Sequence, residues 1–207
     1  MEDAVGLVRN RGRYMQEAVP LGEGAMAAVL GLAADEVEAV CREASQGEVV
    51  EPANLNAPGQ TVIAGHAGAV ERAGVKAKER GAKRVIPLPV SAPFHCRLMR
   101  PAQERLQRDL SGVTFSDPRV PLISNVDAKP VRTGAEVVDA LIRQVSSPVR
   151  WEESVRYLVG QGVDQFVEVG PGKVLSGLVR KVAEHARVVS VEDPSGVEKL
   201  LAEVTDA

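Results

Sequence analysis

The chain has 207 residues, of which 44% are hydrophobic and 26% charged, with a formal net charge of −3. This balance is typical of a globular protein with one large or two small domains, and it gives no electrostatic case for binding nucleic acid or an anionic membrane. No apolar run approaches the roughly 18 residues that a membrane-spanning helix needs, so we expect a cytoplasmic protein. Cys41 and Cys96 are too few for a disulfide framework, and no cysteine and histidine spacing suits a metal.

The first half of the chain predicts a β-α-β-β-α-β order. Its opening residues, MEDAVGLVRNRGRYM, predict an amphipathic helix with Val5, Leu7, Val8 and Met15 available to one side. The elements expected after this helix are strand 24–31, helix 34–45, strands 49–54 and 60–64 joined by a turn, helix 67–80 and strand 84–90. This order is that of a ferredoxin-like unit.

After residue 95 the pattern changes to helices that alternate with isolated strands. The predicted elements are helix 96–111, strand 121–126, helices 134–145 and 151–161, strand 165–169, helix 173–184 and strand 187–191. Such alternation indicates parallel strands covered by helices. The whole chain is therefore expected to have an α/β fold.

His95 lies at the junction between a predicted strand and a predicted helix. Three prolines precede it in the sequence, Pro87, Pro89 and Pro93, and a helical pattern of apolar residues follows it. Functional sites of α/β folds collect at such junctions. From the residues alone, His95 is more often a structural or capping residue than a catalytic one.

Two further motifs each have two interpretations. The residues Gly170–Gly172 follow a strand and open a helix, where backbone N–H groups could bind a phosphate, but a tight turn is favoured because phosphate loops have a longer glycine pattern. The segment Val75–Arg84 carries five basic residues and a single acid. It could steer an acidic partner, although a solvated helix face is the favoured interpretation.

Seven stretches, in order along nearly the whole chain, resemble successive blocks of the malonyl-CoA:acyl-carrier-protein transacylases. Any one block alone is a weak signal, whereas the seven together are very specific. The blocks are RGRYMQEAVP (11–20), GAMAAVLGL (24–32), NLNAPGQTVIAG (54–65), PLPVSAPFHCRLM (87–99), NVDAKP (125–130), RQVSSPVRW (143–151) and FVEVGPGKVLSGL (166–178).

The resemblance implies the C-terminal part of an α/β-hydrolase-like acyltransferase core with a ferredoxin-like inserted subdomain. Residues 1–19 would be a helix of the large subdomain, residues 20–90 the small ferredoxin-like subdomain, and residues 91–207 the remainder of the large one. The resemblance also implies a ping-pong reaction of lipid biosynthesis, in which a serine takes malonyl from coenzyme A and hands it to the phosphopantetheine thiol of acyl carrier protein. Whether the pathway makes fatty acids or polyketides stays open.

The resemblance further assigns roles to five residues. His95 would be the general base and acid that activates the serine, with the backbone carbonyl of Gln144 fixing its tautomer. Arg11 would hold the malonyl carboxylate with two parallel hydrogen bonds, and Phe94 would crowd an α-methyl branch. Asn56 would line the substrate site, although turn chemistry explains it nearly as well. Malonyl-CoA and acyl carrier protein are the expected partners, with no separate cofactor and no metal.

The sequence departs from the family pattern at the nucleophile. None of its eleven serines has glycine at both −2 and +2, so the G-x-S-x-G elbow is absent, as is the earlier glutamine motif of the oxyanion hole. We therefore expect a chain that lacks the N-terminal third of a malonyl transacylase and is inactive alone. The alternative is a catalytically dead module that binds malonyl-CoA or another protein.

Overall fold

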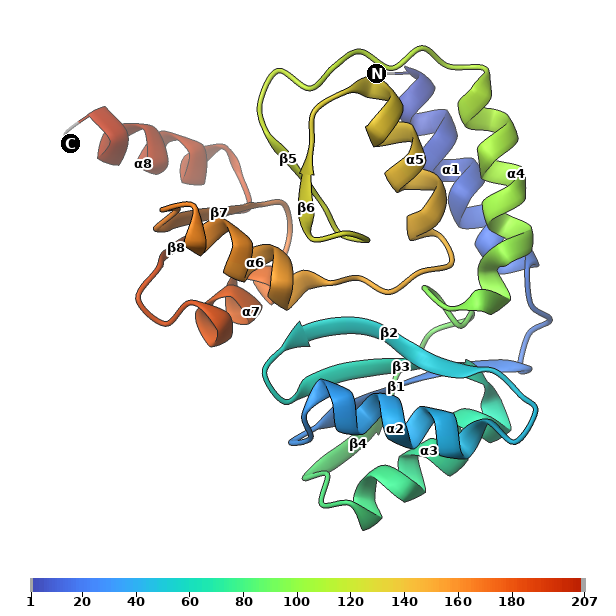
Figure 1. The fold of residues 1–207 in the computed structure, drawn as a ribbon. Coiled ribbons are helices and arrows are strands. Elements are labelled where there is room, and N and C mark those ends of the chain that lie inside the picture. Colours follow the sequence, from blue (N-terminus) through green and yellow to red (C-terminus); the bar gives the residue numbers. More distant parts are fainter. Residues whose placement is uncertain (1, 206–207) are drawn as a thin grey trace. The chain divides into compact units, whose positions relative to one another are not determined.

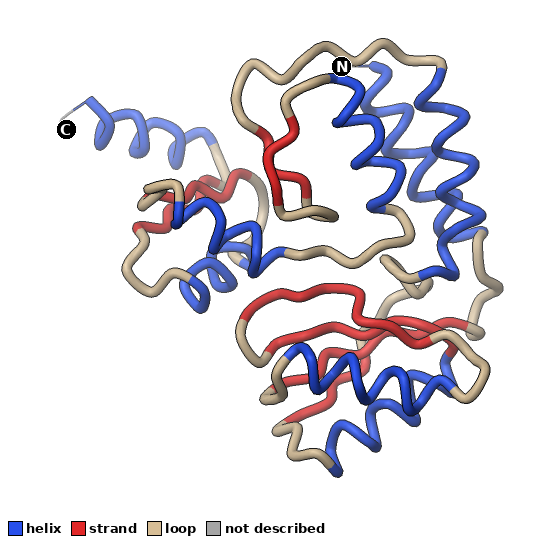
Figure 2. The backbone as a smooth tube through the Cα atoms, viewed as in Figure 1, coloured by secondary structure: helices blue, strands red, loops and turns tan. Residues whose placement is uncertain are grey.

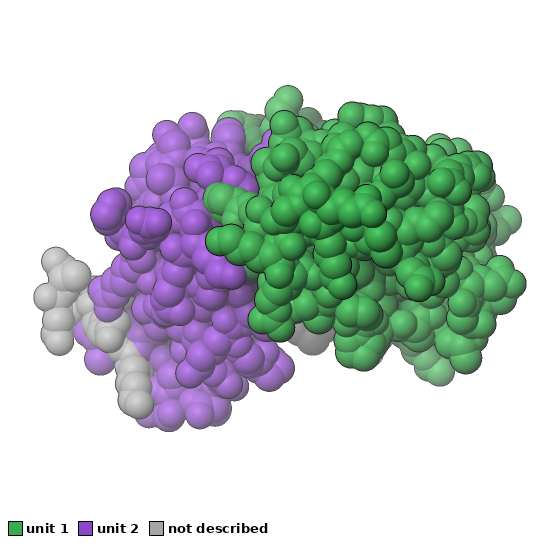
Figure 3. Space-filling view, turned by 90° about the horizontal axis from the view of Figure 1, so that it is seen from below, with its two compact units in different colours: residues 1–151 green, residues 152–207 purple. Residues whose placement is uncertain are grey.

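The structure is a computed structural model that describes residues 2–205. It has two compact units, Met1–Trp151 and Glu152–Ala207, which Figure 3 colours separately. The predicted subdomain boundaries at residues 19/20 and 90/91 divide the chain differently and stay a prediction.

The first unit contains a four-stranded antiparallel sheet with strand order β2-β3-β1-β4. The strands are β1 (Gly24–Leu30), β2 (Val50–Ala57), β3 (Gln60–His66) and β4 (Arg84–Pro87), and the helices α2 (Ala34–Ser45) and α3 (Ala67–Glu79) connect them. The predicted β-α-β-β-α-β order is confirmed. β4 ends three residues earlier than predicted, because the N–H of Val90 bonds to the oxygen of Leu88 and not to β1.

The two faces of this sheet are covered by different elements. Alternating side chains, such as Val29 and Ile63, point to the face that α2 and α3 cover (Figure 1). Met26 and Val62 point to the opposite face, where they pack against Cys96, the residue after His95. The sheet therefore supports the loop that carries His95.

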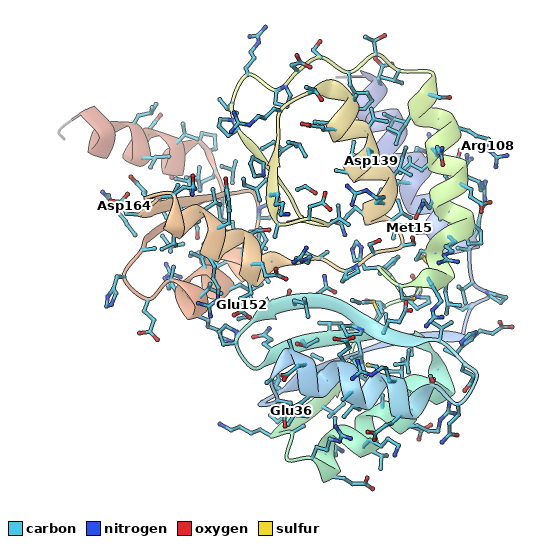
Figure 4. The ribbon with its side chains drawn as sticks, in the orientation of Figure 1. Met15, Glu36, Arg108, Asp139, Glu152 and Asp164 are labelled. Atoms are coloured by element: carbon cyan, nitrogen blue, oxygen red, sulfur yellow. The ribbon has the colours of Figure 1, made fainter. Side chains whose placement is uncertain are left out.

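Three helices form the other core of the first unit: α1 (Glu2–Glu17), α4 (Arg100–Ser111) and α5 (Gly134–Gln144). Met15 of α1, labelled in Figure 4, is buried with Met99, Leu106 and Val145. The predicted single helix 96–111 begins as a short 3-10 turn, η1 (Arg97–Met99), which passes directly into α4.

The predicted apolar face of α1 is only partly right. Met15 is buried and Leu7 packs partly into the helical core, whereas Val5 and Val8 are 66% and 70% exposed. With 3.6 residues per turn, Val5 lies off the side of the helix that carries Leu7, Arg11 and Met15. Val8 lies on nearly the same side as Met15 and lines the cavity that Leu7 and Arg11 also line, so its exposure reflects that cavity and not the helix periodicity.

Two short strands after α4 correct the expectation of parallel pairing. β5 (Leu122–Ser124) pairs antiparallel with β6 (Lys129–Val131), a strand that the sequence did not predict. Only residues 125–128 connect them, and a parallel pair needs a crossover of a dozen or more residues. The connection is therefore a hairpin.

The second unit contains a β-α-β arrangement that confirms parallel pairing there. β7 (Gln165–Val169) and β8 (Arg187–Val191) pair in parallel, and α7 (Val174–Val182) connects them. Figure 2 colours strands red and helices blue. α6 (Trp151–Gly160) precedes this arrangement, and α8 (Pro194–Thr205), which the sequence did not predict, follows it.

Candidate active site

His95 lies in a loop between β4 and η1 and has an unusual backbone conformation. Its φ of 60° is in the left-handed region, which residues other than glycine rarely adopt and which clusters at functional sites. Preceding it, Pro93 is fully buried, and Gly24 of β1 leaves room for its ring, since a Cβ at Gly24 would lie 2.4 Å from Pro93 Cδ. Cys96 is buried too, and its Sγ donates to the Pro93 carbonyl.

The ring of His95 contacts the end of α5. Its Nδ1 lies 3.0 Å from the backbone oxygen of Gln144. Because a carbonyl oxygen only accepts, Nδ1 carries the hydrogen, and Nε2 of the neutral ring has a free electron pair. Burial lowers the pKa of His95, and the charge of Arg11 lowers it further, whereas the backbone hydrogen bonds that the ring makes to Gln144 and Ser147 raise it. The lowered pKa favours the neutral ring, the form that can act as a base.

Gln144 is held by the segment that follows α5. Its Nε2 donates to the backbone oxygens of Ser147, at 2.9 Å, and Pro148, at 3.3 Å. Val149 then pairs with β2: its N–H donates to Ala53 and its oxygen accepts from Leu55, both at 2.8 Å. The acceptor for His95 is thus anchored to the edge of the sheet.

Arg11, on α1, is half-buried and has no hydrogen-bond or ion-pair partner among residues 2–205. Burial lowers the pKa of its guanidinium. It lines a cavity of about 310 Å³ whose other walls are mainly apolar side chains of α1, α4, α5 and the segment after α4, together with the carboxylate of Asp3. Because an unpaired, partly buried cation is costly, Arg11 is suited to bind an anion.

Phe94 and Asn56 differ in how the structure places them. Phe94 is half-buried and packs against both the helical core and the face of the sheet opposite α2 and α3. Asn56 lies in β2, next to the last residue of the strand, and makes no hydrogen bond to His95 or Arg11 in the described part of the chain. The structure thus brings together His95 and Gln144, with the charge of Arg11 acting on the ring, and leaves Asn56 outside these contacts.

Sequence reasoning missed two contacts that hold the ends of the His95 loop. Before the histidine, the Ser91 hydroxyl donates to the side-chain oxygen of Gln16 on α1, at 2.5 Å. After it, Glu51 of β2 binds both the backbone N–H and the side chain of Arg97. Neither contact leaves a local pattern, since the partners lie 75 and 46 positions apart.

The structure of Gly170–Gly172 favours a tight turn over a phosphate-binding loop. Both glycines have positive φ, of 130° and 92°. The Glu168 carboxylate already accepts hydrogen bonds from the N–H groups of Leu175, at 3.0 Å, and Ser176, at 2.7 Å. Because a carboxylate occupies these amides at the start of α7, the turn is poorly suited to bind a phosphate.

The basic segment on and after α3 is partly neutralised. Glu43 of α2 forms ion pairs with Arg80 and with Lys76, the latter at 3.9 Å. The other three basic residues of the segment, Lys78, Lys83 and Arg84, are exposed and have no ion pair within residues 2–205. Only these three are free to meet an acidic partner.

Residues 1–199 match the family described as the acyl transferase domain. The chain belongs to this acyl transferase family. Over 195 residues it is 51% identical to the malonyl CoA-acyl carrier protein transacylase of Escherichia coli (strain K12), a match that covers 94% of the chain and 63% of the relative. The chain thus spans about 63% of the length of this curated relative.

Solved structures of the family confirm the α/β acyltransferase fold. The malonyl CoA-acyl carrier protein transacylase from Coxiella burnetii superimposes with a TM-score of 0.95 at 44% identity, over 97% of this chain and 64% of that one. A malonyl-transacylase in complex with a type II PKS acyl-carrier protein gives a TM-score of 0.94, also at 44% identity, over 97% of this chain and 65% of that one. Between residues 2 and 205, no helix has both the length and the apolar character to cross a membrane.

Proposed function

We propose that this chain contributes the base and the carboxylate-binding side chain for the transfer of a malonyl group from coenzyme A to the phosphopantetheine thiol of acyl carrier protein. The observation that carries the proposal is the contact between the ring of His95 and the Gln144 carbonyl, with burial and the charge of Arg11 both lowering the pKa of the ring. The relatives named as malonyl transacylases support malonyl as the acyl group.

In this mechanism, Nε2 of His95 removes the proton from a serine hydroxyl while the serine oxygen attacks the malonyl thioester carbonyl. The carbon–sulfur bond breaks, and His95 gives its proton to the departing coenzyme A thiolate. The phosphopantetheine thiol then loses its proton to His95 and attacks the malonyl-serine ester, and the proton returns to the serine oxygen. Throughout, the Nδ1 hydrogen remains directed at Gln144, whose carbonyl stabilises the imidazolium.

Arg11 and Phe94 are proposed to select the acyl group. The guanidinium of Arg11 meets the malonyl carboxylate with two parallel hydrogen bonds. Acetyl has no carboxylate, so its binding would leave the guanidinium unpaired. Phe94 is proposed to crowd an α-methyl branch, and Asn56 to line a more distant part of the substrate site.

This sequence contains no G-x-S-x-G elbow, the motif that carries the nucleophilic serine in the family. We therefore propose that the 207-residue chain alone forms no acyl-enzyme. The second candidate function is a module that holds malonyl-CoA without turnover. It is favoured by the same missing elbow, together with the unpaired guanidinium of Arg11.

The test compares His95→Ala with His185→Ala, a substitution of an exposed histidine. Both are made in a chain that is completed with an N-terminal part carrying the nucleophilic serine. After incubation with malonyl-CoA, mass spectrometry of the intact protein measures the rate at which a malonyl adduct forms. We expect His95→Ala to lower this rate by about 10²–10⁴-fold, the usual contribution of a general base, and His185→Ala to leave it unchanged.

Equal rates in the two variants would contradict the role of His95. Tight binding of malonyl-CoA by the unaltered protein without any adduct would instead support the binding module.

A further inference from the structure

A carboxylate that takes no part in the proposed mechanism holds the loop that carries His95. Glu51 lies in β2 opposite Ala64 of β3. Its Oε2 accepts a hydrogen bond from the backbone N–H of Arg97, at 2.9 Å, and its Oε1 accepts one from Arg97 Nε, at 2.5 Å. Both carboxylate oxygens are thus bound to the residue two positions after His95.

The backbone of His95 depends on such contacts. A left-handed conformation of a residue with a side chain persists only where the surrounding structure fixes it. Before His95 the chain is fixed by the buried ring of Pro93, and after it by buried Cys96. The N–H of Arg97 is the next donor along the chain and bonds to Glu51, so this carboxylate completes the support on the downstream side.

The same strand holds the acceptor of the His95 ring. Ala53 and Leu55 of β2 bond to Val149, which lies five positions after Gln144. β2 therefore positions both partners of the contact between His95 Nδ1 and the Gln144 oxygen: the histidine through Glu51, and the carbonyl through Val149. A shift of either partner along β2 would misalign the ring.

We propose that Glu51 is a positioning residue that keeps the ring of His95 in the orientation in which Nδ1 donates to Gln144. This inference rests on the proposed role of His95 as the base. The side chains of Glu51 and Arg97 are 29% and 54% exposed, and an ion pair of that exposure stabilises a protein little. The important contact is the charge-assisted hydrogen bond from the backbone N–H of Arg97.

Nitrogen-15 NMR of the histidine rings reports which ring nitrogen carries the hydrogen. It is measured in the chain completed with an N-terminal part that carries the nucleophilic serine. His66 is an internal reference of opposite tautomer, because its Nδ1 accepts the backbone N–H of Val49 at 2.9 Å and its hydrogen is therefore on Nε2. In Glu51→Ala we expect the His95 signals to move towards a mixture of tautomers. We also expect the pKa of His95 to rise towards its ordinary value as the ring becomes less buried, whereas the tautomer of His66 should stay the same.

Three variants serve as controls. Glu51→Gln keeps an oxygen that accepts the Arg97 N–H, and Arg97→Ala keeps that N–H, so both should retain the Nδ1 tautomer of His95. Glu17→Ala removes an ion pair with Arg105 of comparable exposure that joins α1 to α4, and it should change nothing at His95. For malonyl transfer, we expect Glu51→Ala to lower kcat by about tenfold to a hundredfold with little change in the KM for malonyl-CoA, as for a displaced catalytic group.

An unchanged tautomer and pKa of His95 in Glu51→Ala would overturn the proposal, as would an equal change in Glu51→Gln. If Glu51→Ala does not fold, Glu51→Asp replaces it: its carboxylate is too short to reach both donors, and the same tautomer mixture is expected. A failure of the proposed role of His95 looks different: Glu51→Ala still alters the tautomer of His95, but His95→Ala leaves acyl transfer intact. The two proposals can therefore fail separately.

Discussion

Among single residues, Arg11 affects the proposed site in two ways that substitutions can separate. Its charge lowers the pKa of His95, an effect that any cation at this position would have. Its planar guanidinium can also pair with a carboxylate through two hydrogen bonds, which a lysine ammonium cannot reproduce. Arg11→Lys therefore retains the first effect and loses the second, whereas Arg11→Ala loses both.

We predict that Arg11→Ala lowers kcat/KM for malonyl-CoA by about tenfold to a hundredfold, because hydrogen bonds between charged groups contribute about 1.5–3 kcal/mol. The kcat/KM for acetyl-CoA should fall little, because acetyl has no carboxylate for Arg11 to bind. Arg11→Lys should have an intermediate rate with malonyl-CoA. Steady-state kinetics with both thioesters measures the ratio of kcat/KM for malonyl-CoA to that for acetyl-CoA. It uses the chain completed with an N-terminal part that carries the nucleophilic serine. Equal losses for malonyl and acetyl would refute the carboxylate-binding role.

Between elements, the closest approach that bears on the site is between β1 and the loop that carries His95. Gly24 begins β1, and an added Cβ would lie 2.4 Å from Cδ and 2.6 Å from Cγ of Pro93. A proline ring cannot rotate away as a flexible side chain can. The absence of a side chain at Gly24 therefore lets the loop rest on the sheet, two residues before His95.

We predict that Gly24→Ala destabilises the protein by about 1–3 kcal/mol, the usual cost of overpacking. It should also displace the ring of His95 from Gln144. The matched control is Gly6→Ala in α1, where nothing lies within 4 Å of an added Cβ and the substitution should stabilise by about 0.5–1 kcal/mol. Urea unfolding measures both changes. A Gly24→Ala protein as stable as the unaltered one would show that the loop moves without cost.

At the level of the whole molecule, the two units differ in how completely their sheets are covered. The four-stranded sheet packs one face against α2 and α3 and the other against the loop that carries His95. β7 and β8 form only a two-stranded sheet, and Val167 and Val169 of β7 are 40% and 80% exposed. Exposed apolar side chains beside an unpaired strand edge favour association.

We predict that the purified 207-residue chain associates in size-exclusion chromatography and forms no malonyl adduct with malonyl-CoA. Amide hydrogen exchange should be slowest in β1 and β3, the central strands of the four-stranded sheet, and faster in β7 and β8. A sharp monomer peak would contradict the expected association. Uniform protection would contradict the expected difference between the two sheets. A malonyl adduct formed at catalytic speed would reveal a nucleophile outside the G-x-S-x-G pattern.

By itself the sequence determined the features that local patterns encode. Period-2 and period-3.6 apolar patterns predicted the order of elements from 24 to 90, and the proline-rich approach placed His95 at a strand-to-helix junction. The ordered blocks pointed to the acyl transferase family. Each of these signals depends on residues that are close together in the chain or on a fixed order of short motifs.

Only the tertiary structure decided how distant segments meet. The His95 ring and the Gln144 oxygen lie 49 positions apart, and Glu51 and Arg97 lie 46 apart, so no local periodicity records either pair. The resemblance implied the first contact, whereas nothing in the sequence pointed to the second. Likewise, the exposure of Val5 and Val8 depends on which side of α1 faces its neighbours, because burial is a property of packing between elements and not of one helix.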